Sequence, residues 1–195
     1  MTDRVSASGA HDALEIAELV FGHAWNVRGN PHHQAFVSAA PRLLGVPLPQ
    51  RPLTSAGTNA VTLLWLGPRS WLHVGGEASP QGDYESARRA VNAVGGALFD
   101  VSASYVGWRV SGATIARVLN RACPLDFHPR AFEPGRCAHS LLGHVTALFH
   151  RPYDEPSFVV MVARSFAAEA LHVLREAAKP DGHRLGEPTA FPTAR

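Results

Sequence analysis

Residues 61–74 read VTLLWLGPRSWLHV, and this stretch decides the fold class. The run from Val61 to Leu66 is apolar enough to be buried on both faces, as is typical of a central strand. Gly67-Pro68 interrupts the run and residues 71–74 resume it, which predicts an antiparallel hairpin. Because segments with helical patterns precede and follow this hairpin, the sequence favours an α+β protein.

Several other segments carry apolar residues at helical spacing. Asn30 is a good N-cap, Pro31 would occupy the first helical position, and Gly45 supplies a left-handed stop. Asp83 is placed to cap a second helix in the same way. The predicted helices cover residues 31–44, 83–94, 112–121 and 165–178.

The remaining regular segments are strand-like. Besides the hairpin, they cover residues 19–27, 97–103, 105–110, 137–150 and 157–163. The resulting order is β-α-ββ-α-ββ-α-β-β-α. This order predicts antiparallel or mixed sheets with interleaved helices, built from ferredoxin-like split units.

The length of 195 residues fits one domain or two small interlocked ones. We expect a variable N-terminal arm over residues 1–17 and a Pro-rich C-terminal tail over residues 179–195. Between them, residues 18–178 should form one α+β domain or two interlocked subdomains, about 18–110 and 111–178.

The composition is that of a globular cytoplasmic protein. Hydrophobic residues make up 46% and charged residues 17%, which excludes a disordered chain. A net charge of +2 without a clustered basic face argues against nucleic-acid binding. With no apolar leader and no run of about 18 apolar residues, we expect neither secretion nor a membrane span. Cys123 and Cys137 are expected to be reduced core thiols.

Complete catalytic and cofactor motifs are missing from the sequence. Neither G-x-G-x-x-G nor G-x-x-x-x-G-K-S/T occurs, so no Rossmann or P-loop site can be argued. A G-x-S-x-G nucleophile elbow is absent as well. Cys137 and His139 share a strand face and His128 is near in sequence, but a zinc site needs four ligands at paired spacing. We therefore predict no catalytic residue and no metal site on this chain.

Asp100 and Arg109 are the candidates for ligand binding. Asp100-Val101-Ser102 places a carboxylate and a hydroxyl on one strand face, where Asp100 could hydrogen-bond a pterin or an amine. The same residues could instead cap a neighbouring turn, and this alternative is the stronger one. Arg109 and Trp108 lie on the next predicted strand, so they could join Asp100 in a folate site.

Residues 123–136, CPLDFHPRAFEPGR, form an irregular segment with three prolines. Long irregular segments inside compact domains often bind something, although this one could equally be a scaffold that wraps the core. Its candidate partner contacts are Leu125, Phe127, His128, Arg130 and Phe132.

This segment also carries a family resemblance. The pattern C-P-L-D-F-H-P-R-A-F-x-P-G-x-C-A closely resembles the signature stretch of the gamma subunit of heterotetrameric sarcosine oxidases. Further matching pieces follow the same order along the chain, and the resemblance covers about residues 20–178. These pieces are Asn26-Val27-Arg28-Gly29, L-G-V-P-L-P within 43–49, W-L-G-P-x-x-W-L at 65–72, D-V-S at 100–102 and R-S-F-A at 164–167.

The resemblance implies a fold related to the folate-binding aminomethyltransferase of the glycine cleavage system and to YgfZ-like proteins. It also implies alpha, beta and delta partner subunits in a complex that demethylates sarcosine oxidatively and passes the one-carbon unit to tetrahydrofolate. FAD, FMN, NAD, tetrahydrofolate and zinc would then be bound by other subunits, and this chain alone would bind no cofactor.

Two alternatives remain open. The chain could be a stand-alone folate-binding protein similar to the aminomethyltransferase, although it has only about half the length of that enzyme. It also lacks the K-G-C-Y-x-G-Q-E type motif of YgfZ-like proteins. The chain could otherwise be the equivalent subunit of another N-methyl amino acid oxidase or dehydrogenase.

Overall fold

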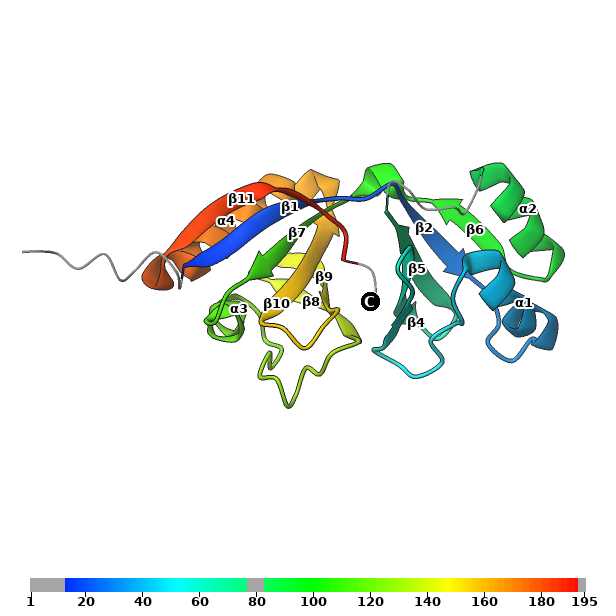
Figure 1. Ribbon diagram of the computed structural model, residues 1–195, viewed down its shortest axis with the longest axis horizontal. Coiled ribbons are helices and arrows are strands. Elements are labelled where there is room, and N and C mark those ends of the chain that lie inside the picture. Colours follow the sequence, from blue (N-terminus) through cyan, green and yellow to red (C-terminus); the bar gives the residue numbers. More distant parts are fainter. Residues whose placement is uncertain (1–12, 77–82, 193–195) are drawn as a thin grey trace, which may run out of the picture.

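The computed structural model describes residues 13–76 and 83–192, which form two β-sheets with helices on their outer faces (Figure 1). One sheet is antiparallel with the strand order β3-β4-β5-β2-β6, and the other is mixed with the order β11-β1-β7-β10-β9-β8. The α+β class with antiparallel and mixed sheets is therefore confirmed.

The antiparallel sheet consists of β2 (His23–Arg28), β3 (Ser55–Gly57), β4 (Val61–Gly67), β5 (Ser70–Gly75) and β6 (Ala97–Asp100). The mixed sheet consists of β1 (Leu14–Val20), β7 (Tyr105–Ser111), β8 (Arg136–Leu142), β9 (Val145–Arg151), β10 (Ser157–Ala163) and β11 (His183–Ala190). The helices are α1 (Gln34–Leu44), α2 (Tyr84–Ala93), α3 (Ile115–Ala122) and α4 (Ala167–Ala178). Short 3-10 turns cover Ser102–Ser104, Arg164–Phe166 and Lys179–Asp181. No helix among these described residues is long and apolar enough to cross a membrane.

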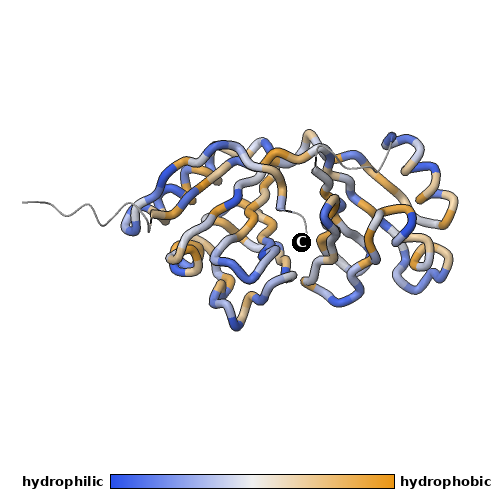
Figure 2. The backbone as a smooth tube through the Cα atoms, in the orientation of Figure 1, coloured by the Kyte–Doolittle hydropathy of each residue, from blue (hydrophilic) through white to orange (hydrophobic). Residues whose placement is uncertain are grey.

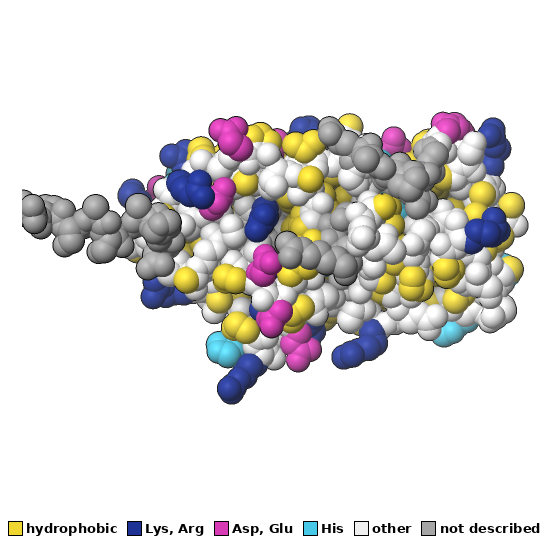
Figure 3. Space-filling model, in the orientation of Figure 1, with side chains coloured by type: hydrophobic (Ala, Val, Ile, Leu, Met, Phe, Trp, Pro, Cys, Tyr) yellow, Lys and Arg dark blue, Asp and Glu magenta, His cyan; other side chains and the backbone are white. Residues whose placement is uncertain are grey.

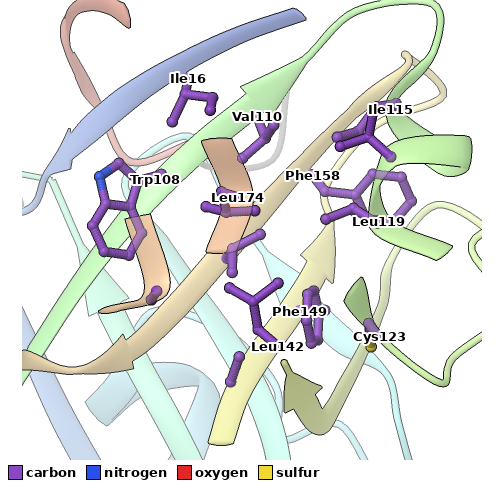
Figure 4. Close-up of a cluster of buried hydrophobic side chains, with 14 of the residues drawn as sticks. Ile16, Trp108, Val110, Ile115, Leu119, Cys123, Leu142, Phe149, Phe158 and Leu174 are labelled. Atoms are coloured by element: carbon purple, nitrogen blue, oxygen red, sulfur yellow. The ribbon is translucent and has the colours of Figure 1, made fainter. Parts of the chain in front are cut away.

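Three buried clusters hold these layers together. One lies between the mixed sheet and α3 and α4, where Phe149, Phe158 and Leu174 meet (Figure 4). A second packs α1 and α2 on the antiparallel sheet. The third joins the two sheets, with Leu72 on one side and Met161 on the other. Hydrophobic residues accordingly recur along most strands of both sheets, and hydrophilic residues are frequent in the loops (Figure 2).

The hairpin predicted over residues 61–74 is present as β4 and β5. Leu64 pairs with Leu72 in an antiparallel register, and both are fully buried. Trp71 is buried on the opposite face of β5, where its Nε1 donates a hydrogen bond to the carbonyl oxygen of Pro49 at 2.9 Å. Burial on both faces explains why this stretch is apolar at nearly every position.

The predicted helices are all present, with small changes at their ends. Helix α1 begins at Gln34 because Asn30 forms a turn before it, in which the Asn30 Oδ1 accepts a hydrogen bond from the His32 amide at 3.0 Å. The helix ends as predicted at Gly45, which has a φ of 73°. The Asp83 side chain accepts a hydrogen bond from the Ser86 amide and caps α2 as expected.

Two predicted strands are each divided in two. The segment 19–27 belongs to β1 and β2, which lie in different sheets. The segment 137–150 is the hairpin of β8 and β9, because Gly143 adopts a φ of 61° and turns the chain back.

The ends of the chain also differ from expectation. Strand β1 of the mixed sheet begins inside the predicted arm 1–17, and its Leu14 and Ile16 are buried in the cluster between that sheet and α3 and α4. The predicted tail 179–195 contains β11, which pairs in parallel with β1. The chain leaves the antiparallel sheet for the mixed sheet at residues 101–104, which is earlier than the expected boundary at residue 110.

Candidate functional site

The segment 123–136 is a structured loop between α3 and β8, and it projects from the body of the molecule (Figure 1). Phe127 and Phe132 stack on each other at 5.6 Å between ring centroids. Phe127 also makes edge contacts with Phe149 and Phe158. Phe127 is completely buried and Phe132 is 4% exposed, so the prediction of both as partner contacts is wrong. An aromatic side chain in an irregular loop can point into the core as readily as outward.

Polar contacts fix the backbone of this loop. The Asn120 Oδ1 accepts a hydrogen bond from the Phe127 amide at 3.0 Å, and the Asp126 Oδ1 accepts one from the His128 amide at 2.8 Å. The buried Arg151 guanidinium donates to the carbonyl oxygen of Phe132 at 2.9 Å. The loop therefore has a defined shape although it has no repeating structure.

The other candidate contacts of the loop lie at or near its surface. His128 and Arg130 are exposed, and the His128 Nδ1 accepts a hydrogen bond from the Arg130 amide at 3.2 Å. Leu125 is half-buried and packs against the core beneath the loop. Of the five predicted contacts, His128 and Arg130 are thus the ones available to a partner.

The Asp100 carboxylate is used within the fold. Its Oδ1 accepts hydrogen bonds from the amide and the hydroxyl of Ser102 at 2.9 and 2.5 Å. The Ser102 hydroxyl in turn contacts the backbone of Ala24 on β2. Asp100 therefore caps the turn at which the chain passes between the sheets, in agreement with the stronger of its two interpretations.

Arg109 lies away from Asp100, in the middle of β7 on the mixed sheet. Its Nε donates to the Ser157 Oγ at 3.3 Å, and its guanidinium is 3.9 Å from the Glu155 carboxylate. It lines a hollow of about 340 Å³ that also contains Glu15 and Arg184.

The predicted clustering of Asp100, Arg109 and Trp108 on adjacent strands is therefore wrong. Trp108, the neighbour of Arg109 on β7, is buried in the core on the other face of the strand. Asp100 lies on a different sheet, so Asp100, Arg109 and Trp108 do not come together. The predicted adjacency failed because β6 and β7 are consecutive in sequence but belong to different sheets.

His73 and Cys137 are buried and make polar contacts within the fold. His73 is completely buried, its Nε2 lies 2.9 Å from the carbonyl oxygen of Leu44, and burial lowers its pKa to about 4. The Cys137 thiol contacts the carbonyl oxygen of Thr54, and burial raises its pKa to about 12. Both cysteines are free, as predicted. Within residues 13–76 and 83–192, no group of three metal-ligating side chains comes together.

The structure also reveals a groove that the sequence analysis did not identify. Two hollows, of about 490 and 530 Å³, both contain Arg28 and Ser70 at one end of the antiparallel sheet. We call them together the Arg28 groove, which is lined by Asn26, Arg28, Arg69, Ser70, Phe99 and Tyr105. The matching pieces at residues 26–29, 65–72 and 100–102 were signals of this groove in the sequence, but their distance along the chain concealed that they come together.

The Arg28 side chain is held in position inside the groove. The Arg28 Nε donates to the Asn26 Oδ1 at 2.9 Å, and the Asn26 Nδ2 donates to the Ser70 Oγ at 3.0 Å. The guanidinium carbon lies 6.0 Å from the centroid of the Phe99 ring, within the range of a cation–π contact. Phe99 itself is 50% exposed.

Arg164 binds the backbone of the segment that connects the two sheets. Its guanidinium donates to the carbonyl oxygens of Ala103 and Tyr105, both at 2.9 Å. Three of the matching sequence pieces, at residues 26–29, 100–102 and 164–167, therefore contribute to this region and to the adjoining groove.

Comparison with known families and curated proteins gives one consistent result. Residues 28–179 match the family described as "Sarcosine oxidase, gamma subunit family". The chain is 29% identical over 181 residues to a sarcosine oxidase subunit gamma of Corynebacterium sp. (strain P-1), covering 91% of this chain and 86% of that subunit. It is 30% identical over 184 residues to the subunit of the same name from Arthrobacter sp., with the same coverage of both chains.

Solved structures extend this comparison to the fold. A chain of the heterotetrameric sarcosine oxidase from Corynebacterium sp. U-96, in complex with pyrrole 2-carboxylate, matches with a TM-score of 0.79 and 25% identity over 91% of this chain and 92% of that chain. The glycine cleavage system aminomethyltransferase T from Bartonella henselae matches with a TM-score of 0.63 and 11% identity. The latter match covers 92% of this chain but 49% of the transferase, so the two share a fold over half of that enzyme.

Proposed function

The chain belongs to the sarcosine oxidase gamma subunit family and is a gamma-type subunit of a heterotetrameric sarcosine oxidase; we propose that its role in that assembly is structural. The observation that carries this proposal is that the similarity spans both sheets, covering 91% of this chain and 92% of the matching oxidase chain.

The chemistry of the described side chains supports a structural role. Asp100 caps the turn between the sheets, and His73 is a neutral imidazole buried beside Leu44. The Cys137 thiol has a pKa of about 12, so it is far from forming the thiolate that acts as a nucleophile at neutral pH. These groups stabilise the fold, and we propose that amine oxidation takes place on partner subunits.

The partners proposed for this chain are the large alpha subunit and the beta and delta subunits. Oxidation of sarcosine would use FAD, FMN and NAD on those subunits, zinc would be bound by the delta subunit, and tetrahydrofolate would accept the one-carbon unit. The proposal places this assembly in the cytoplasm, without nucleic acid or membrane as a partner.

The loop 123–136 is the proposed main contact with the large subunit. Phe127 and Phe132 anchor the loop from below, so His128 and Arg130 are presented on a defined surface. A rigid loop loses less conformational entropy on association than a flexible one. Arginine is also enriched at interfaces.

A direct experiment tests the structural role. The chain purified alone should show no flavin absorbance and should consume no oxygen when sarcosine is added. Co-expression with the other three subunits should give an assembly that shows flavin absorbance and consumes oxygen when sarcosine is added. Stoichiometric flavin in the isolated chain would contradict the proposal.

The rival function is that of a stand-alone folate-binding protein, and the fold shared with the aminomethyltransferase favours it. Titration of the isolated chain with tetrahydrofolate separates the two proposals. Micromolar binding would favour the rival. Comparing sarcosine with N-methylglutamate as substrates of the co-expressed assembly would then separate sarcosine oxidase from related N-methyl amino acid enzymes.

A further inference from the structure

The Arg28 groove has a charge that nothing in its lining balances. Arg28 and Arg69 both line it, and no aspartate or glutamate among the described residues does so. Some arginines elsewhere in the chain are paired within it, because Arg109, Arg151 and Arg184 each lie within 4.0 Å of a carboxylate. The groove is therefore a cationic site, and its charge would be complemented by a carboxylate from outside the chain.

The orientation of Arg28 favours binding of such a carboxylate. The amide of Asn26 is fixed by the Ser70 hydroxyl at 3.0 Å and by the carbonyl oxygen of Trp71 at 3.3 Å, and it accepts the hydrogen bond from the Arg28 Nε. An arginine fixed at Nε keeps its two terminal nitrogens for another partner. A planar guanidinium binds a carboxylate through two parallel hydrogen bonds.

The remaining walls of the groove are apolar and open. Leu66, Val101 and the half-exposed Phe99 line the hollow of about 490 Å³ beside Arg28. Phenylalanine and arginine are both enriched at protein interfaces relative to the rest of the surface. Both hollows open broadly to solvent, which suits an extended chain segment better than a small enclosed ligand.

We propose that the Arg28 groove binds a segment of another subunit of the oxidase, in which a carboxylate pairs with Arg28 and a neighbouring apolar side chain covers Phe99. The carboxylate belongs to an aspartate, a glutamate or the C-terminus of that subunit. This inference rests on the proposed function. It adds a second contact with the partner subunits, on the antiparallel sheet, whereas the loop 123–136 belongs to the half of the chain that forms the mixed sheet.

Photo-crosslinking identifies the occupant directly. Phe99 is replaced by p-benzoylphenylalanine in the co-expressed assembly, which is irradiated and analysed by peptide mass spectrometry. The proposal predicts one crosslinked peptide from another subunit, with an aspartate, a glutamate or a C-terminus beside the crosslinked residue. A crosslink within this chain, a peptide without a carboxylate, or no crosslink at all would overturn the proposal.

Substitutions test the role of the guanidinium. Arg28→Ala should weaken the affinity for the partner subunits about 10-fold, equivalent to about 1.4 kcal/mol. Arg28→Lys should recover part of this loss, because a lysine keeps the charge but lacks the paired hydrogen bonds. The control variant is Arg42→Ala, which changes an exposed arginine on α1 outside the groove. This variant should bind the partner subunits as tightly as the parent chain does.

The two proposals fail in different ways. Full assembly of Arg28→Ala, with a circular dichroism spectrum and melting temperature like the parent's, would refute the groove and leave the subunit role intact. A parent chain that binds none of the other subunits would refute both.

Discussion

The hydroxyl of Ser102 contacts both polar groups of the Ala24 backbone. The Ser102 Oγ lies 2.9 Å from the amide nitrogen of Ala24 and 3.3 Å from its carbonyl oxygen. Ala24 belongs to β2 of the antiparallel sheet, and Ser102 begins the turn that leads to the mixed sheet. The Asp100 carboxylate orients the same hydroxyl. Ser102 therefore fixes the segment 101–104, which connects the two sheets, to strand β2.

Ser102→Ala should lower the free energy of unfolding by about 1–3 kcal/mol, because the buried amide of Ala24 loses its hydrogen-bond acceptor. Urea denaturation followed by circular dichroism measures this change. Ser104→Ala is the matched control at an exposed position of the same turn, and it should change stability by less than about 0.5 kcal/mol. Equal effects of both substitutions would contradict the role of Ser102.

Phe127→Ala should destabilise the chain by about 3–5 kcal/mol, because it opens a cavity among Phe132, Phe149 and Phe158. A shifted midpoint in thermal or urea denaturation would show the loss. A variant that melted like the parent would mean that the loop 123–136 does not pack as described.

His128→Ala and Arg130→Ala combined should keep the parent's circular dichroism and melting temperature, because both side chains are exposed. The double variant should recover less large subunit on co-purification, with an affinity loss of about 1–3 kcal/mol. Full recovery of the complex would place the main interface elsewhere and leave this loop as a scaffold.

The stability of the chain should fall as the pH is lowered from 6.5 toward 4. Burial lowers the pKa of His73 from 6.5 to about 4, so in this range the unfolded chain binds a proton that the folded chain does not. The contribution of His73 to the free energy of unfolding is complete above pH 6.5. About 3 kcal/mol of this contribution is lost by pH 4. The completely buried His150 acts in the same direction.

Urea denaturation at several pH values between 7 and 4 measures this slope. His73→Asn should reduce the slope, and His172→Gln at an exposed position of α4 should leave it unchanged. An unchanged slope in His73→Asn would show that His73 does not stay neutral in the folded chain.

The fold could be predicted from the sequence wherever burial or a capping residue leaves a local pattern. The hairpin of β4 and β5 was visible because both of its strands are apolar, and α1 and α2 were marked by Gly45 and Asp83. Strand β11 left no such pattern, because most of its side chains are exposed and it contains Pro188, which an edge strand tolerates. The turn at Gly143 was missed because apolar residues alternate on both sides of it.

The candidate site was harder to predict because it depends on which way side chains point. No period in the loop 123–136 indicated that Phe127 and Phe132 point inward while His128 points outward. The Arg28 groove combines residues from β2, the β4–β5 turn and β6. Only the pairing of these strands brings Arg28 and Phe99 together.

The most direct test of the account is the composition of the assembly itself. The four proposed subunits are co-expressed, and native mass spectrometry determines which chains are present in the purified oxidase. We predict a complex that contains this chain and the large subunit in equal numbers and that oxidises sarcosine. An active oxidase that assembles fully from the other subunits and excludes this chain would contradict the central claim.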